Sequence, residues 1–249
     1  MPFGPQEMEW GVPTKTPKML FRAALSPTIS TRMQESFNAQ FLTAAEIESI
    51  LARIFGSRLL FSGFEAVASR KWVQETDLGF KYLFLIHPQR NGAAYYPSGA
   101  ISLDFVPRLV AGEFKMRPKP KHAAVHFSFE TGKKTRWDWM IDKSRETFGE
   151  KVERIAAQSV TEITGWFQRF NSVIDIVAAI DEAKRTARPV DFYCYPDLVL
   201  AYTFALARVR RIPDAKSEFE HVLKSKFYDV DLLPQLESFF EAEIKTAET

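Results

Sequence analysis

The hydrophobic pattern of this 249-residue chain changes from the period of strands to the period of helices near Lys143. Before that residue, apolar and polar side chains alternate in several short segments, which is the period of β-strands. After it, apolar residues recur every three or four positions from Val152 to Phe170 and beyond, which is the period of helices. A run of strands followed by a run of helices predicts an α+β fold.

A helix is expected ahead of the strands, beginning at Thr43. Thr43 and Glu46 have the spacing of a capping box, in which both side chains bond amides at the start of the helix. Apolar residues at helical spacing continue from Ile47 to Phe55. Either Gly56 or Gly63 is expected to end this helix.

The alternating segments predict strands joined by short turns, and therefore an antiparallel sheet of four to six strands with this helix packed on it. The segment Phe80–His87 is apolar on both faces and is expected to be a central strand. Residues Thr131–Lys134 have turn character and would join the last two strands as a hairpin. The predicted strands are Lys71–Gln74, Phe80–His87, Ile101–Phe105, Val125–Phe129 and Trp137–Ile141.

The second half of the chain is expected to form a bundle of four or five helices. One helix from Val152 to Thr186 would be too long for a domain of this size. Ser172 can cap a new helix, so the run is divided near Asn171. The prolines that mark the later helix boundaries are Pro196, Pro213 and Pro234.

These patterns divide the chain into three stretches. Residues 1–40 contain five scattered prolines and no periodicity, which predicts an extended or poorly ordered leader. Residues 41–142 are the predicted α+β sheet domain. Residues 143–249 are the predicted helical region, which we expect to pack on the sheet as one unit.

The order of these segments also resembles a known kind of protein. A helix ending at Gly63, a long amphipathic strand and a hairpin precede a helix pair that spans Leu198 to Leu223. Residues 41–226 resemble bacterial domain-of-unknown-function proteins with a helix-plus-antiparallel-sheet front half and a helical, tetratricopeptide-like rear. The resemblance implies this fold and implies no established activity and no catalytic residues.

Composition excludes several classes of protein. With 46% hydrophobic and 26% charged residues, the chain is neither disordered nor collagen-like. A single cysteine, Cys194, excludes an internal disulfide and fits a reducing compartment. The longest apolar stretch, Phe192–Ala207, is interrupted by Pro196 and Asp197, and no secretory signal is found. We therefore expect a soluble cytoplasmic protein without a membrane partner.

No usual fingerprint of a hydrolase or of a nucleotide-binding enzyme occurs in the sequence. His122 and His126 have the spacing of two helical zinc ligands, but no Glu follows the first of them. On a strand, their side chains would lie about 13 Å apart. Cys194 is interpreted as a half-buried structural cysteine rather than a nucleophile. No catalytic residue, metal or other cofactor is therefore favoured.

One pattern points to an enzyme instead. Asp104 and the segment Glu113-Phe-Lys115 are similar to the Asp…Glu-x-Lys arrangement of metal-dependent nucleases of the restriction-endonuclease fold. In such a nuclease two carboxylates hold Mg²⁺ against the scissile phosphate, and the lysine assists the attacking water. That fold expects a helix soon after the lysine, whereas Pro118 and Pro120 follow here. The nuclease is therefore kept as an alternative.

Charge is unevenly distributed along the chain. The segment Arg108–Arg145 contains 10 Lys or Arg against 4 Asp or Glu, whereas the segment from Asp214 to Thr249 contains 4 against 9. The basic stretch can track phosphates, contact an acidic protein, or form a solvated sheet edge, and we favour the last two. The candidate polyanion-binding or partner-binding residues are Arg117, Lys119, Lys121, Lys133, Lys134 and Arg136.

The sequence therefore predicts a non-catalytic protein-binding module whose partner is another protein. An adaptor, an immunity-type inhibitor and a subunit of a bacterial assembly all fit this description. The alternatives are the Mg²⁺-dependent nuclease and a nucleic-acid-binding subunit that uses the basic residues 115–136.

Overall fold

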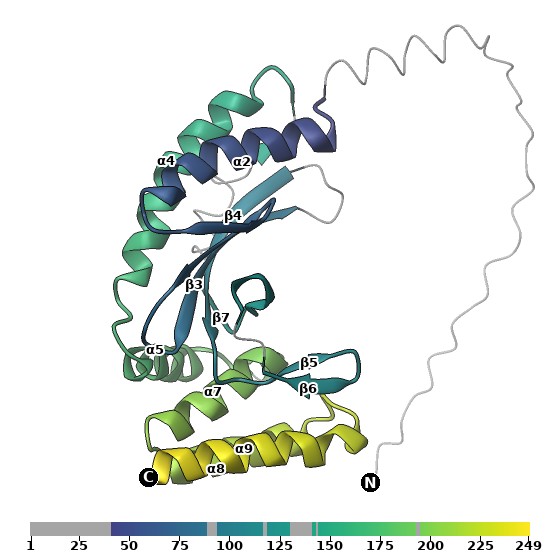
Figure 1. The fold of residues 1–249 in the computed structure, drawn as a ribbon, viewed down its shortest axis with the longest axis vertical. Coiled ribbons are helices and arrows are strands. Elements are labelled where there is room, and N and C mark those ends of the chain that lie inside the picture. Colours follow the sequence, from purple (N-terminus) through teal and green to yellow (C-terminus); the bar gives the residue numbers. More distant parts are fainter. Residues whose placement is uncertain (1–40, 89–93, 117–118, 130–140, 143, 193–194) are drawn as a thin grey trace, which may run out of the picture. The chain divides into compact units, whose positions relative to one another are not determined.

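The computed structural model describes residues 41–88, 94–116, 119–129, 141–142, 144–192 and 195–249 (Figure 1). All of them belong to one compact unit, residues 40–249. The predicted leader, residues 1–40, and most of the predicted strand Trp137–Ile141 lie outside the described residues.

The described chain has the predicted α+β fold, with one helix before an antiparallel sheet and the other helices after it. The strands are β1 (Glu65–Ala68), β2 (Lys71–Glu75), β3 (Phe80–Pro88), β4 (Ala94–Leu103), β5 (Arg108–Val110), β6 (Glu113–Lys115), β7 (Phe127–Phe129) and β8 (Ile141–Asp142). The helices are α2 (Ala44–Leu60), α4 (Phe148–Phe167), α5 (Val173–Thr186), α6 (Pro189–Phe192), α7 (Pro196–Arg208), α8 (Ile212–Lys224) and α9 (Leu233–Glu248). Two 3-10 turns, η1 (Pro120–His122) and η2 (Val230–Leu232), complete the fold.

The main sheet has six strands in the order β1-β2-β3-β4-β7, and β8 also pairs with β4. The predicted central strand is confirmed, because β3 lies between β2 and β4 and is buried on both faces. Strand β4 is longer than predicted: residues 94–100, which precede the predicted strand, contain Pro97 and Gly99, which are unusual in strands. Here Pro97 pairs with Ile86 and Gly99 with Phe84.

Among the described residues, the segments Val125–Phe129 and Trp137–Ile141 do not pair with each other, so the predicted hairpin is not formed there. Phe129 pairs with Gly99, and Ile141 pairs with Tyr95, so both segments run antiparallel to β4. They therefore run in the same direction, whereas the two strands of a hairpin run in opposite directions.

Helices α2 and α4 pack on one face of this sheet, as Figure 1 shows. Phe55 of α2 contacts Trp72 and Phe84, with ring centroids 6.2 and 5.5 Å apart. Gly99 of β4 lies directly under Ile163 of α4, since a Cβ added there would be 2.6 Å from the Ile163 Cγ2 atom. The same apolar core continues into α5, α7, α8 and α9.

The predicted helix ends are largely confirmed. Thr43 and Glu46 form the capping box, and the Ser172 side chain accepts a bond from the Asp175 amide at the start of α5. Helix α2 continues through Gly56 and ends at Leu60, so the later of the two predicted stops is the better one. Pro196, Pro213 and Pro234 each lie in the first turn of a helix.

The small sheet of β5 and β6 is a separate hairpin that the alternating pattern did not predict. Its two-residue turn, Ala111-Gly112, has φ values of 51° and 80°, as the favoured hairpin turns require. The Gln235 side chain of α9 accepts a bond from the Phe114 amide (2.8 Å) and donates one to the Phe114 carbonyl (3.0 Å). The hairpin is thereby attached to the helical region. No helix of the described residues is long and apolar enough to cross a membrane.

Candidate functional site

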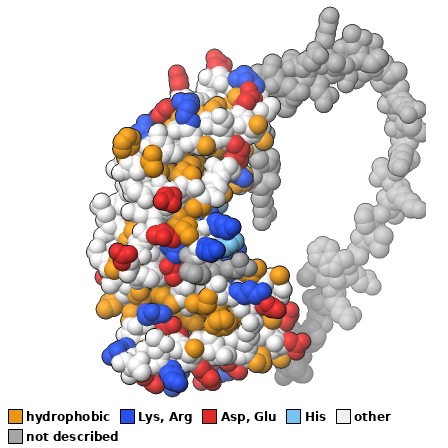
Figure 2. Space-filling model, viewed as in Figure 1, with side chains coloured by type: hydrophobic (Ala, Val, Ile, Leu, Met, Phe, Trp, Pro, Cys, Tyr) orange, Lys and Arg blue, Asp and Glu red, His pale blue; other side chains and the backbone are white. Residues whose placement is uncertain are grey.

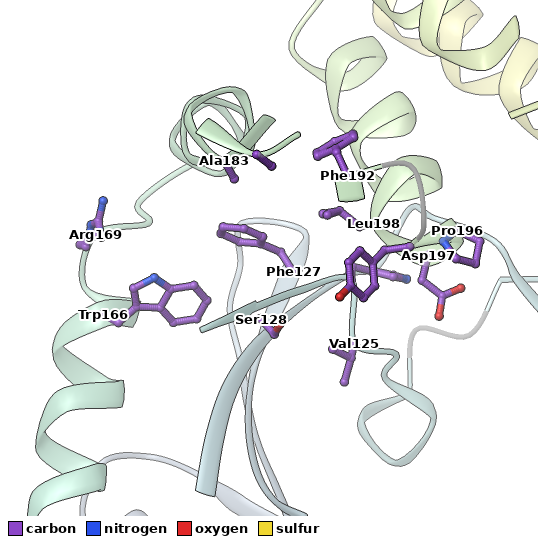
Figure 3. Close-up of a pocket in the computed structure, with 13 residues that line it drawn as sticks. Val125, Phe127, Ser128, Trp166, Arg169, Ala183, Phe192, Pro196, Asp197 and Leu198 are labelled. Atoms are coloured by element: carbon purple, nitrogen blue, oxygen red, sulfur yellow. The ribbon is translucent and has the colours of Figure 1, made fainter. Parts of the chain in front are cut away.

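A cavity of about 680 Å³ opens between strand β7, the end of α4 and the α6–α7 segment (Figure 3). Its walls are mostly apolar, and four aromatic side chains line it: Phe127, Trp166, Phe192 and Tyr195. Cavities of this size and composition, with a few polar groups at their margins, are typical of binding sites.

The aromatic walls are held by packing against one another. The ring centroid of Phe127 lies 5.7 Å from that of Trp166 and 6.1 Å from that of Phe170. The ring centroids of Trp166 and Phe170 are 4.9 Å apart. On the opposite wall, Phe192 meets Tyr202 edge to face at 6.0 Å. These contacts hold Phe127, Trp166 and Phe192 in place, so these walls of the cavity are formed before anything binds.

His126 is the buried polar residue of the cavity wall. Its Nδ1 atom accepts a hydrogen bond of 2.8 Å from the Leu103 amide, so the proton of the neutral ring resides on Nε2. Burial, with a smaller contribution from the Arg108 charge, lowers the pKa of His126 to about 4. At neutral pH this residue is therefore an uncharged hydrogen-bond donor.

Two groups of opposite charge also line the cavity, Arg169 after α4 and Asp197 in the first turn of α7. Burial raises the pKa of the Asp197 carboxyl above its ordinary value, and the Arg108 charge opposes that shift. Neither Arg169 nor Asp197 has an ion pair in the part of the chain that the structure describes.

The candidate nuclease residues lie on separate sheets. Asp104, just after β4, pairs with the buried ammonium of Lys81. Glu113 and Lys115 pair with each other at 2.6 Å on the exposed side of the β5–β6 hairpin, and this contact lowers the pKa of Glu113. Each carboxylate thus has a lysine of its own, and β4 and β6 are not neighbours. Among the described residues, no group of three or more His, Cys, Asp or Glu side chains could hold a metal ion.

The basic residues are only partly within the described chain. Lys119 and Lys121 are exposed beside and within η1, whereas Arg117, Lys133, Lys134 and Arg136 lie outside the described residues. The end of η1 is held by two further cations. Lys71 donates to the Ala123 carbonyl (2.6 Å), and Arg108 donates to the His122 carbonyl (3.2 Å). Figure 2 shows Lys and Arg side chains gathered beside a histidine near the middle of the displayed face.

Sequence reasoning missed the cavity because its residues come from four separate segments. Phe127 was identified only as part of the predicted strand Val125–Phe129, and Trp166 was not singled out. The one local signal is the aromatic cluster just before Pro196, where Phe192 and Tyr195 lead into α7. Cys194, in the same segment, lies outside the described residues.

Comparison with protein-family models, with curated proteins and with solved structures finds no match to this chain.

Proposed function

We propose that this chain is a non-catalytic cytoplasmic protein-binding module that receives an apolar side chain of its partner in the cavity beside β7. The observation that carries the proposal is the rim of the cavity. Tyr195 is 60% exposed and Val125 is 40% exposed, next to walls of packed aromatic rings. Exposed apolar side chains around a formed apolar cavity are typical of an interaction site.

The residue types favour a protein partner over a metabolite. Binding energy between proteins is concentrated in a few tryptophan, tyrosine and arginine side chains, and Trp166, Tyr195 and Arg169 occur together here. The exposed rim also offers contact area outside the cavity, which a small ligand enclosed within it would not use. An adaptor, an inhibitor or an assembly subunit would each bind in this way.

Tyr195→Ser tests the proposal, with Phe61→Ser as the matched control. Tyr195 is the N-cap residue of α7, and serine is a favourable N-cap, so this variant should fold normally. Phe61 is 93% exposed and does not line the cavity. Tagged wild-type chain is purified from its native host, its partner is identified, and affinity is measured with the purified pair by calorimetry.

We expect Tyr195→Ser to weaken binding about tenfold or more and Phe61→Ser to leave it unchanged. Equal affinities for wild type and Tyr195→Ser would show that the cavity is not the interface. A chain that binds no protein but turns over a substrate would overturn the proposal altogether.

A further inference from the structure

Strand β7 lies at an edge of the sheet in the part of the chain that the structure describes. It pairs with residues 99–101 of β4, and no other described strand pairs with it. An edge strand directs part of its backbone N–H and C=O groups away from the sheet. Those groups can pair with a strand supplied by another chain.

The cavity follows this edge. Two successive strand residues, Phe127 and Ser128, line it, together with Val125 and His126 just before β7. Successive side chains of a strand point to opposite faces of the sheet, so a cavity on one face would meet only every second residue. Contact with both Phe127 and Ser128 indicates a groove that runs along the strand edge. We call this cavity the β7 groove.

The far side of the β7 groove is apolar and helical. Phe192, Leu198 and Ala183 of α6, α7 and α5 face Phe127 across it, as Figure 3 shows. Phe127 is only half-buried despite its contacts with Trp166 and Phe170. An added strand could therefore bond β7 through its backbone and bury one large side chain between the groove walls.

The two ends of the β7 groove carry opposite charges. Arg169 and Asp197 lie on opposite sides of Phe127 in Figure 3. A bound segment with an acidic residue near Arg169 and a basic residue near Asp197 would supply each group with a counter-ion. This polarity favours one direction for the bound chain.

We propose that the β7 groove binds an extended peptide segment of a partner protein, which joins the sheet as a strand beside β7. One aromatic or large aliphatic side chain of the segment occupies the space between Trp166 and Phe192, and flanking charges of opposite sign face Arg169 and Asp197. This inference rests on the proposed function, because it specifies how the partner occupies the same cavity.

A displayed library of random peptides is the probe. Selection on the full-length protein should enrich peptides with one large apolar residue, and these should bind wild type and Phe61→Ser but not Tyr195→Ser. Arg169→Glu should reverse the enriched charge at one end from acidic to basic. Arg154→Glu, at an exposed arginine of α4 outside the groove, should leave it unchanged.

Backbone N-methylation of an enriched peptide tests strand addition itself. In a bound strand only every second peptide N–H bonds the neighbouring strand. We therefore expect affinity losses of about two- to tenfold at alternate positions and little effect between them.

The outcomes separate this inference from the proposed function. A partner or peptide that needs Tyr195 but shows no alternation under N-methylation would overturn strand addition and leave the protein-binding proposal standing. A library that yields no Tyr195-dependent peptide, while the native partner still depends on Tyr195, would also overturn the peptide inference alone. If neither peptide nor partner depends on Tyr195, both proposals are wrong.

Discussion

His126 illustrates how a single residue can depend on the fold for its charge state. Its Nδ1 atom accepts a hydrogen bond from the Leu103 amide at the end of β4, and the residue is only 6% exposed. A protonated ring would lose that acceptor and would place a charge near Arg108. The folded protein therefore favours neutral His126.

We predict that His126 makes the fold less stable in acid. Its pKa is about 4 in the folded state against an ordinary 6.5, so below pH 6.5 the unfolded chain takes up the proton first. The free energy of unfolding should fall as pH drops from 6.5 to about 4, by on the order of 2–3 kcal/mol from this residue.

Urea unfolding of wild type and His126→Asn across this pH range measures the effect. The asparagine oxygen can still accept the Leu103 amide but doesn't titrate, so the difference between the two proteins isolates the histidine. Parallel stability curves for the two proteins would contradict the prediction.

At the scale of elements, the contact of α4 with β4 determines where the end of α4 lies, and with it one wall of the β7 groove. Gly99 permits this approach, because an added Cβ would be 2.6 Å from Ile163 and 3.2 Å from Phe167. Phe167 also stacks on Tyr82, with ring centroids 4.6 Å apart. A shift of α4 would therefore move Trp166 as well.

Gly99→Ala should lower the free energy of unfolding by about 1–3 kcal/mol through overpacking. The clash involves the branched Cγ2 methyl of Ile163, which leucine lacks, so Gly99→Ala/Ile163→Leu should recover part of the loss. Thermal or urea unfolding of the single and double variants measures both changes. An unchanged midpoint for Gly99→Ala would show that α4 does not pack on β4 this closely.

For residues 40–249 as a whole, Arg208 connects three parts of the fold. Its guanidinium lies 4.3 Å from the centre of the Phe105 ring, beside the end of β4. It also pairs with Glu243 of α9 through two bonds, one of them 2.9 Å from Nη2 to Oε2. Glu243 is only 8% exposed, so it depends on Arg208 for its counter-charge.

Arg208→Met should destabilise the protein by about 1–3 kcal/mol, because it leaves the buried Glu243 carboxylate without its cation. The loss is limited because the Arg208 side chain is partly exposed. Arg208→Met/Glu243→Met should recover part of that loss, since an apolar pair can replace a buried ion pair. Both variants should unfold in one transition, whether followed by tryptophan fluorescence or by helical circular dichroism. Two separate transitions would show that sheet and helices unfold independently.

Local sequence patterns predicted an element correctly wherever the interactions that form it lie within one segment. The Thr43 and Ser172 caps depend on side chains three residues from their targets. The burial of β3 follows from apolar residues on both of its faces. Residues 94–100 of β4 could not be predicted as a strand, because Pro97 and Gly99 oppose a strand locally. Pairing with β3 and the close approach of α4 override that preference.

The sequence by itself determined the α+β class, the order of its elements and most helix ends, since these follow from periodicity and from bonds within one turn. Only the tertiary structure decided that Asp104 and Glu113 have separate lysine partners. It alone also brought Phe127, Trp166, Phe192 and Tyr195 around one cavity. Phe127, Trp166 and Phe192 are tens of positions apart, so their meeting depends on how β7 and the helices pack, and no local pattern records that packing.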